Sequence, residues 1–259
     1  MILLVSNPTD ILSLEVLLRC SACGLGREDV IACDDKTLFD SASLALRMDR
    51  TGTEGSLTIL DRRLAFDELE GVLYRPGRWW WPGEGFDIQD QMFVYHETMA
   101  SWFAILSALP CRVVNRFGLS WWLQDLNYPR QLAVGLAEAL DLPARISAPA
   151  GECAVGRIVP SGPPPSGSEW MYFAGRRVIP GAQCTEALVE HAEARGYAVD
   201  AWQEETGLSV VRADFTGGEH PALRYVEGFP LLEGEPPEVI AELGDAVIEL
   251  LLEKRRAGV

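Results

Sequence analysis

The sequence predicts two successive α/β units, a first one in which strands and helices alternate and a second one of the α+β type. Residues 2–6, "ILLVS", form an apolar run that leads into a helical pattern, and a second apolar run follows at 29–33. The composition changes at the Pro/Gly/Ser tract 160–169, which is typical of a linker or an exposed loop. Beyond this tract, strand patterns lie on both sides of a helical one. We expect domains that span residues 1–118 and 119–259, so that this tract lies inside the second one.

The first unit is expected to open as a β-α-β pattern. Its first strand leads into a helix that Asp10 could cap and that runs to Gly24. The second strand should pair with the first in parallel, because a helix connects them. The further elements are expected to be a hairpin around the turn "TGTEG", a strand at 69–75, a helix at about 88–107 and a strand at 112–115. The apolar residues of the long helix recur at helical spacing: Ile88, Met92, Tyr95, Met99, Trp102, Phe103 and Leu106.

The second unit is expected to begin with a helix at 128–140. Pro129 lies in its first turn, where the missing N–H group costs nothing. The stretch "EWMYFAGRRVIP" predicts a strand, a Gly-Arg turn and a second strand. The remaining elements are expected to be a helix at 185–196, strands at "AVDAWQ" and "LSVVRADF", and a last amphipathic helix at about 236–256.

The composition excludes several classes of partner. Of the 259 residues 48% are hydrophobic, so the chain can bury a sizeable core. Its formal charge of −16 argues against nucleic-acid backbones and anionic membranes, because a surface that binds phosphates needs an excess of Lys and Arg. Residues 1–10 lack the features of a signal peptide, and the chain has no apolar run long enough to span a membrane. We therefore expect a cytoplasmic protein that binds neither nucleic acid nor membrane.

The six cysteines favour a reducing compartment over a disulfide framework in a chain of this length. Cys20 and Cys23 form a C-x-x-C pair near the end of a predicted helix, with Cys33 downstream. This pair could bind a metal or act in redox chemistry. Because no second pair follows it, we prefer the interpretation that these cysteines are buried as small apolar side chains.

Several short motifs occur in an order that is typical of one superfamily. "LEGVLYRPGR" precedes a long helix, "LPCRVVNR" precedes a helix and "ALDLPAR", and "WMYFAGRRV" reads as a hairpin. In this order the chain resembles the ATP-grasp superfamily, in particular its RimK-like and graspetide-maturase group. The resemblance implies a Rossmann-like, pre-ATP-grasp N-terminal domain and a second, shortened ATP-grasp-like domain of the α+β type.

The resemblance also implies how a nucleotide would be bound. In that family ATP lies between two lobes, two lysines contact its phosphates, and a late acidic cluster with a Glu-x-Asn ending holds Mg²⁺. An acyl-phosphate forms only where cations and metal neutralise the charge of the γ-phosphate. The implied activity is that of an ATP-dependent carboxylate–amine ligase or peptide-modifying enzyme.

The chain departs from this pattern where the phosphates would be held. Of its 22 basic residues only Lys36 and Lys254 are lysines, so neither phosphate-contacting lysine is present. Arg130 stands where the first of them is expected, and an arginine can also hold a phosphate. The Pro-rich tract 160–169 falls where the family has a strand beside the adenine, and prolines cannot supply the N–H groups of a ladder strand.

The chain also departs from the family at the metal site. Asn127 is the last asparagine, so no Glu-x-Asn motif can exist in the C-terminal half. Asp214 and Glu227 are the nearest acidic residues, one each rather than a cluster, and are weak candidates for metal ligands. We therefore expect no bound cofactor, with ATP and Mg²⁺ as the alternative.

The candidate ligand-binding residues are arginines and tryptophans near strand ends. Four arginines fall where open α/β sheets place their ligands: Arg75, Arg78, Arg116 and Arg130. They could hold a carboxylate or a phosphate, although ion pairs with the abundant Asp and Glu residues are the alternative. Three successive tryptophans between Pro and Gly could form a peptide-binding platform or plug the seam between the lobes: Trp79, Trp80 and Trp81. Asn115 and Arg157 complete the set, and no catalytic residue is assigned.

Three functions remain open at this point. The first is a degenerate ATP-grasp-like protein, a pseudoenzyme that binds a peptide or small acidic molecule and serves a partner enzyme in a biosynthetic peptide-modification pathway. The second is an active ATP-dependent ligase, with Arg130 and Arg157 on the phosphates and Asp214 and Glu227 on magnesium. The third is a non-catalytic subunit whose tryptophans form the interface of a homo-oligomer.

Overall fold

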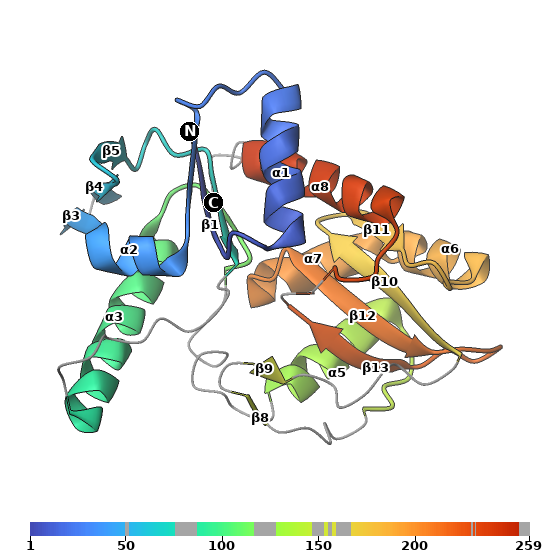
Figure 1. The fold of residues 1–259 in the computed structure, drawn as a ribbon. Helices are drawn as coiled ribbons and strands as arrows, with labels where there is room; N and C mark the ends of the chain where they lie inside the picture. The colour runs from blue at the N-terminus through green and yellow to red at the C-terminus, as the bar shows by residue number, and fades with distance from the viewer. Residues whose placement is uncertain are drawn as a thin grey trace. The chain divides into compact units, whose positions relative to one another are not determined.

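The computed structural model describes residues 1–49, 52–75, 87–116, 128–146, 153–154, 157–158, 167–228, 230 and 232–253. The chain divides into two compact units, one of residues 1–116 with 248–259 and one of residues 117–247. Parallel and antiparallel sheets both occur, so the fold is a mixed α/β fold (Figure 1). Within the described ranges, no helix combines the length and the apolar character that crossing a bilayer requires.

A parallel sheet with the strand order β2-β1-β6-β7 lies at the centre of the first unit. Its strands are β1 (Ile2–Ser6), β2 (Val30–Cys33), β6 (Gly71–Arg75) and β7 (Arg112–Val114). β1 and β6 are apolar and buried almost throughout, as central strands of a parallel sheet are. The parallel pairing of β1 with β2 confirms the predicted β-α-β opening.

Helix α1 (Ile11–Ala22) connects the first two strands, but it begins differently from our expectation. Asp10 occupies the N-cap position, yet its side chain makes no capping hydrogen bond. Its carboxylate instead accepts hydrogen bonds from Nε of Arg75, at 2.7 and 2.9 Å. An ion pair with a guanidinium competes with the cap, because one carboxylate cannot point both along the helix and toward the end of β6.

Two further helices of this unit have aspartate caps. Helix α2 (Asp35–Ser41), which the sequence pattern did not predict, starts at Asp34, whose carboxylate accepts from the Thr37 N–H at 2.7 Å. Helix α3 (Ile88–Ala108) confirms the predicted long helix, and it is capped by Asp87. The expected apolar face of α3 is buried only from Tyr95 onward. Ile88 and Met92 are exposed, so the helical spacing of apolar residues extends beyond the part that packs on the core.

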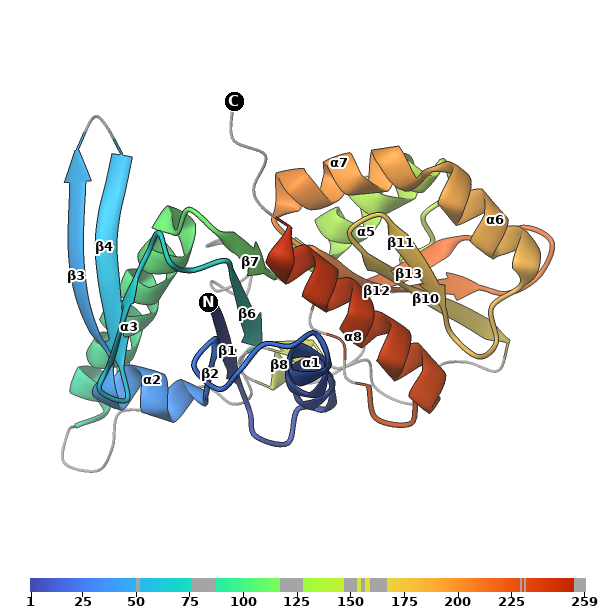
Figure 2. The ribbon, with the colours of Figure 1, turned by 90° about the horizontal axis from the view of Figure 1, so that it is seen from above.

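An antiparallel ribbon of β3 (Ser43–Asp49), β4 (Gly52–Ile59) and β5 (Arg62–Ala65) also belongs to the first unit (Figure 2). The predicted hairpin is present, but four of the five residues of "TGTEG" lie in a strand. Asp49 pairs with Gly52, so residues 52–55 of that stretch lie in β4. Leu60 and Asp61, both with positive φ, form the two-residue connection between β4 and β5 that suits the twist of paired strands.

The second unit is built on an antiparallel sheet with the order β11-β10-β12-β13. Its strands are β10 (Ser168–Ala174), β11 (Arg177–Pro180), β12 (Val210–Thr216) and β13 (Leu223–Glu227). Ala174 pairs with Arg177 across Gly175 and Arg176, which confirms the predicted Gly-Arg hairpin turn. Two short strands, β8 (Cys153–Ala154) and β9 (Arg157–Ile158), pair with each other.

Three helices cover one face of this sheet, namely α5 (Tyr128–Leu140), α6 (Glu186–Ala194) and α7 (Gly196–Thr206). The core between them contains the apolar residues that alternate along the strands, among them Met171 and Phe173 of β10 and Val211 and Ala213 of β12. Phe215 continues this row at the end of β12. The residues between these positions therefore point to the opposite face.

Helix α7 corrects one expectation. "AVDAWQ" was predicted as a strand, but these residues lie in the middle of α7. Val199, Trp202 and Gln203 are buried, at a spacing of three to four residues that matches a helix face. The Gln203 side chain donates a hydrogen bond to the Ser209 carbonyl oxygen at 3.0 Å, and Gly207, with φ of 74°, ends the helix. Tertiary packing decides the structure of this short stretch, whose local pattern is ambiguous.

The close approach of β6 to the last helix, α8 (Pro237–Leu252), yields a prediction. A Cβ atom at Gly71 would lie 2.5 Å from the backbone oxygen of Leu251, which cannot move without shifting the helix. We expect Gly71→Ala to lower the free energy of unfolding by about 1–3 kcal/mol, measured by denaturant titration. Gly26→Ala is the matched control, because there the new methyl group meets only the mobile carboxylate of Glu28. Equal losses in the two variants would contradict this account of Gly71.

Candidate functional site

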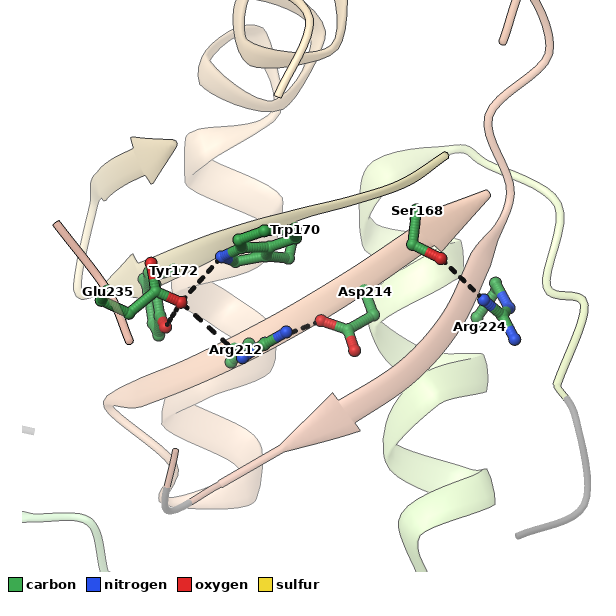
Figure 3. Close-up of polar contacts among 7 residues, drawn as sticks. All are labelled: Ser168, Trp170, Tyr172, Arg212, Asp214, Arg224 and Glu235. Carbon is green, nitrogen blue, oxygen red and sulfur yellow. Dashed lines mark hydrogen bonds and ion pairs between the residues drawn. The ribbon is translucent and has the colours of Figure 1, made fainter. Parts of the chain in front are cut away.

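The second sheet has a polar face, formed by residues that alternate with the core residues. Trp170 and Tyr172 of β10 lie opposite Asp214 and Arg212 of β12, respectively. Residues that are directly opposite in an antiparallel pair lie on the same face, so these four side chains meet on the side away from α5, α6 and α7 (Figure 3). Strand alternation alone thus places a cation, a carboxylate and two aromatic hydrogen-bond donors together.

Arg212 lies at the centre of this group. Its Nε donates to Asp214 Oδ1 at 2.8 Å, and its guanidinium lies 5.1 Å from the centre of the Trp170 ring. Glu227, at the end of β13, is directly opposite Arg212 across the strand pair. Burial alone would lower the pKa of Arg212, but the charge of Asp214 and the hydrogen bond to it outweigh burial and raise that pKa. Arg212 therefore stays positively charged, and carboxylates already satisfy it.

Glu235 completes the group from the segment between β13 and α8. Its Oε1 accepts hydrogen bonds from Trp170 Nε1 at 2.9 Å and from the Tyr172 hydroxyl at 2.7 Å. The same oxygen lies 3.7 Å from Nη1 of Arg212, and the side chain is only 5% exposed. Its other oxygen, Oε2, is buried and has no hydrogen-bond partner among the described residues. A buried carboxylate is thus held against the sheet by two neutral donors and one cation.

Tyr172 responds to this environment. Burial, followed by its hydrogen bond to Glu235 and the charge of that carboxylate, raises the pKa of the Tyr172 hydroxyl far above its ordinary value. The hydroxyl therefore remains a hydrogen-bond donor at every physiological pH. It fixes Glu235 and is unsuited to act as a base.

The charges on this face sum to a negative value, since Arg212 and Arg224 are outnumbered by Asp214, Glu227 and Glu235. Arg224 donates to the Ser168 hydroxyl at 2.9 Å (Figure 3). A site for a triphosphate needs a net positive charge. A magnesium ion needs carboxylates that are not already bound to another cation. Asp214 is already bound to the Arg212 guanidinium. In the described part of the chain, no group of three or more His, Cys, Asp or Glu side chains could hold a metal ion. The described residues of this face therefore do not fit a Mg-nucleotide.

The first unit uses two of the predicted site arginines internally. Arg75, at the end of β6, is largely buried and pairs with Asp10. Arg116 donates to the carbonyl oxygens of Ser107, Leu109 and Cys111, at 3.2 to 3.3 Å, where α3 ends and β7 begins. Asn115 is buried beside it at the end of β7. These contacts hold the ends of the strands and helices together, and the proposed ligand role of all three residues stays a prediction.

The other predicted residues fall in different parts of the chain. Arg130 is exposed in the first turn of α5, and Arg157 belongs to β9. Asp214 and Glu227 lie on the polar face described above. Arg78 and the tryptophan run, residues 79–81, lie outside the described residues. Among the predicted residues that the structure describes, the two acidic ones share this face, and Arg75, Asn115 and Arg116 lie at the ends of the neighbouring strands β6 and β7.

Four residues of the polar face are not among the predicted site residues: Trp170, Tyr172, Arg212 and Glu235. A signal for three of them was present, because "EWMYFA" and "VVRADF" each alternate between polar or amphipathic residues and apolar ones. Two neighbouring strands with this alternation must collect the polar residues on one face. No local signal identifies Glu235, which reaches the sheet from a loop.

The role of Arg212 as the shared cation can be tested by stability. Arg212→Met should lower the free energy of unfolding by about 3 kcal/mol, because it leaves Asp214 and the buried Glu235 without a cation. Denaturant titration measures the loss. Arg176→Met is the control, since Arg176 forms an exposed pair with Asp200 and its loss should cost less than about 1 kcal/mol. Similar losses at the two positions would show that Arg212 is not a central contact.

The raised pKa of Tyr172 predicts a pH dependence. Unfolded tyrosine ionises near pH 10, whereas folded Tyr172 keeps its proton well above that value. The folded-state pKa is the higher one, so its contribution to stability is complete below about pH 10 and is lost as the pH rises further. The free energy of unfolding should therefore fall more steeply above pH 10 in the wild type than in Tyr172→Phe. Parallel curves for the two proteins would contradict the assignment.

Comparisons with known proteins place this architecture among characterised folds. No protein-family model and no curated protein sequence matches the chain. The structure is similar to the macrocyclase MdnC from Microcystis aeruginosa MRC bound with its precursor peptide MdnA, with a TM-score of 0.65 and 14% identity over 97% of this chain and 99% of that one. It is also similar to a RiPP-associated ATP-grasp ligase from Chryseobacterium gregarium, in complex with ADP and a leader and core peptide, with a TM-score of 0.62 and 11% identity over 98% and 96%.

A third similar structure is the ATP-grasp ligase PsnB complexed with minimal precursor, Mg and ADP, with a TM-score of 0.62 and 12% identity over 96% of this chain and 97% of that one. In each case the likeness extends over almost the whole length of both chains. At this level of identity it shows the fold and not the activity. The chain has the fold of the ATP-grasp ligases.

Proposed function

We propose that this protein binds a peptide in a peptide-modification pathway and uses the ATP-grasp fold as a binding scaffold, without ordinary ATP-dependent ligation. Support for the peptide comes from the structural neighbours, three of which were crystallised with precursor or with leader and core peptides. Support for the loss of ligation comes from the charges of this chain. The single observation that supports the proposed loss of ligation is the pairing of Arg212 with carboxylates of the same chain.

The polar face of the second sheet supports this proposal in physical terms. Phosphoryl transfer needs cations that are free to follow the charge as it develops on the γ-phosphate. Arg212 is bound to Asp214 and lies near Glu235 and Glu227, so a nucleotide would have to displace carboxylates that the fold holds in place. Displacement would leave those carboxylates buried without a partner, which is costly.

The basic residues elsewhere support the same conclusion. The chain has no lysine between residues 36 and 254. Arg75 and Arg116 already bind groups of the first unit, and Arg130 is exposed. Two of the predicted site arginines are therefore already engaged, in a chain whose formal charge is −16.

We further propose that the first unit is a Rossmann-like, pre-ATP-grasp domain. In its parallel order β2-β1-β6-β7, β2 lies on one side of β1 and β6 lies on the other. The strand order therefore reverses between β1 and β6. Open sheets of this kind bind ligands beside the carboxyl ends of the strands at such a reversal. β6 ends there with Arg75, whose pair with Asp10 would have to open for a ligand carboxylate to replace it.

A titration by calorimetry tests the nucleotide part of this proposal. We expect no saturable heat when Mg-ATP is added to the wild-type protein, because Arg212 of the polar face is already paired with carboxylates. The peptide part is tested with a candidate precursor peptide encoded beside the gene, by fluorescence anisotropy and mass spectrometry. The peptide should bind equally with and without Mg-ATP, and its mass should stay unchanged.

The opposite results would support an active ligase. Saturable binding of Mg-ATP, together with the loss of one water per bond formed in the peptide, would overturn the proposed lack of ligation. A failure of the peptide to bind under either condition would overturn the peptide role instead. The Arg130→Ala variant separates these cases further, since it should alter binding only if Arg130 contacts a phosphate.

A further inference from the structure

The ion pair between Arg75 and Asp10 has the composition of a carboxylate site that the chain's own carboxylate occupies. Arg75 lies at the carboxyl end of β6, beside the reversal of strand order, and its side chain is 7% exposed. Its Nε atom donates to both carboxylate oxygens of Asp10, at 2.7 and 2.9 Å. A guanidinium recognises a carboxylate by its charge and its planar N–H donors, whatever molecule carries that carboxylate. A ligand carboxylate could therefore fill the place that Asp10 now takes.

Asp10 has a second binding place at the start of α1. Its backbone already has the N-cap conformation, with φ of −70° and ψ of 114°, and its carbonyl oxygen accepts a hydrogen bond from the Leu14 N–H at 3.0 Å. In the same position of α3, the Asp87 side chain accepts from the N–H groups of Gln89 and Asp90, at 2.9 and 3.0 Å. A rotation of the Asp10 side chain would therefore let its carboxylate cap α1.

A buried hydroxyl group in the first turn of α1 would gain from this rotation. Ser13 is the third residue of α1 and 6% exposed, and its Oγ atom has no hydrogen-bond partner among the described residues. Helix side chains lean toward the N-terminus of their helix, so this hydroxyl lies over the first turn. A carboxylate at the N-cap accepts from the N–H groups of that turn and brings an acceptor close to the hydroxyl.

The loop between β1 and α1 does not depend on the ion pair. Asn7 Oδ1 accepts from the N–H and the hydroxyl of Thr9, at 3.0 and 2.9 Å, and the Asp10 N–H donates to the Asn7 carbonyl oxygen at 2.9 Å. These bonds keep the backbone of Asp10 in place when its carboxylate leaves Arg75. The exchange therefore needs only a side-chain rotation.

We propose that Arg75 binds the carboxylate of a ligand, and that Asp10 is a displaceable internal occupant that moves to the N-cap of α1 when the ligand binds. The guanidinium keeps a carboxylate partner throughout, so no buried cation is left unpaired. The charge of Asp10 gains the free N–H groups and the dipole of the helix. An N-cap of this kind offsets a loss of about fivefold in ligand affinity, so part of the cost of displacement is recovered within the protein.

The chemistry of the site favours a carboxylate as the ligand group. The place that Asp10 leaves has the size of a carboxylate, and one guanidinium balances its single charge, whereas a phosphate group carries more charge. An acidic side chain of a bound peptide is the source that the proposed function implies, and this part of the inference rests on that function. A free carboxylic acid would be recognised by the same contacts.

Rescue by acetate tests the site in the full chain. The serine of Asp10→Ser still caps α1 but leaves Arg75 without its carboxylate, so the melting temperature Tm should fall. Acetate should raise this Tm by several degrees more than chloride at equal ionic strength, because a ligand that binds only the folded protein stabilises it. In the double variant Asp10→Ser, Arg75→Met the two salts should act alike. Equal effects of the two salts on Asp10→Ser would overturn the proposal.

A second variant and a matched control complete this test. Asp10→Asn keeps the shape and the capping ability of aspartate without its charge, and it takes the place of Asp10→Ser if that variant does not fold. Asp200→Ser is the control, because Asp200 pairs with Arg176, which is 62% exposed and so gains little from a carboxylate. An acetate-specific stabilisation of equal size in the control would overturn the assignment to Arg75.

Amide hydrogen exchange tests the movement of Asp10. In the wild type, acetate should shift the NMR signal of the Arg75 Nε–H group and slow the exchange of the Ser13 amide severalfold, because the Asp10 carboxylate then caps it. In Asp10→Ser this amide should be protected in chloride already. A wild-type spectrum that acetate leaves unchanged, or a shift at Arg75 without slower exchange at Ser13, would overturn the proposed displacement.

Two short peptides identify the source of the carboxylate. Both have blocked ends, and they differ only in a central glutamate or glutamine. The glutamate peptide should stabilise Asp10→Ser as acetate does, and the glutamine peptide should not. A response to acetate alone would assign the site to a free carboxylic acid and overturn the peptide source. These probes replace the precursor peptide, so the carboxylate site can fail while the precursor still binds, and the reverse.

Discussion

The second unit depends on one guanidinium group. Asp214 and the buried carboxylate of Glu235 both lie against it on the polar face. Arg212 supplies that cation, contacts Asp214 through Nε and also lies against the Trp170 ring. A guanidinium has several donors in a fixed plane, so it can serve partners on β12, β10 and the following loop together.

The same use of arginine occurs in the first unit. Arg75 joins the end of β6 to the start of α1 through Asp10, and Arg116 joins three carbonyl oxygens between α3 and β7. Two of the arginines that the sequence suggests as ligand-binding cations, Arg75 and Arg116, therefore make contacts within the first unit. In an acidic chain this is physically reasonable, because each arginine has many carboxylates and carbonyl groups competing for it.

Strong periodicity made much of the fold predictable. The apolar runs of β1, β2 and β6, the Gly-Arg hairpin and the helices α3, α5 and α8 all follow from local patterns. The prediction was less successful for short elements, because their periodicity is too weak to distinguish a helix from a strand. Helix α2 has only seven residues, and "AVDAWQ" was too short to distinguish helical from extended spacing, so the packing of Trp202 and Val199 decided the outcome. The misplaced hairpin turn shows that two glycines near a turn can instead lie inside a strand.

By itself, the sequence determined the order of the elements, the apolar faces that form the two cores, and the scarcity of lysine. These properties are local or compositional, so a reader can count them along the chain. Only the tertiary structure decided which charged groups meet. Arg75 pairs with an aspartate 65 residues away, and Glu235 reaches Trp170 over the same separation. Such contacts arise from strand register and loop geometry, and the spacing of residues along the chain carries no information about either.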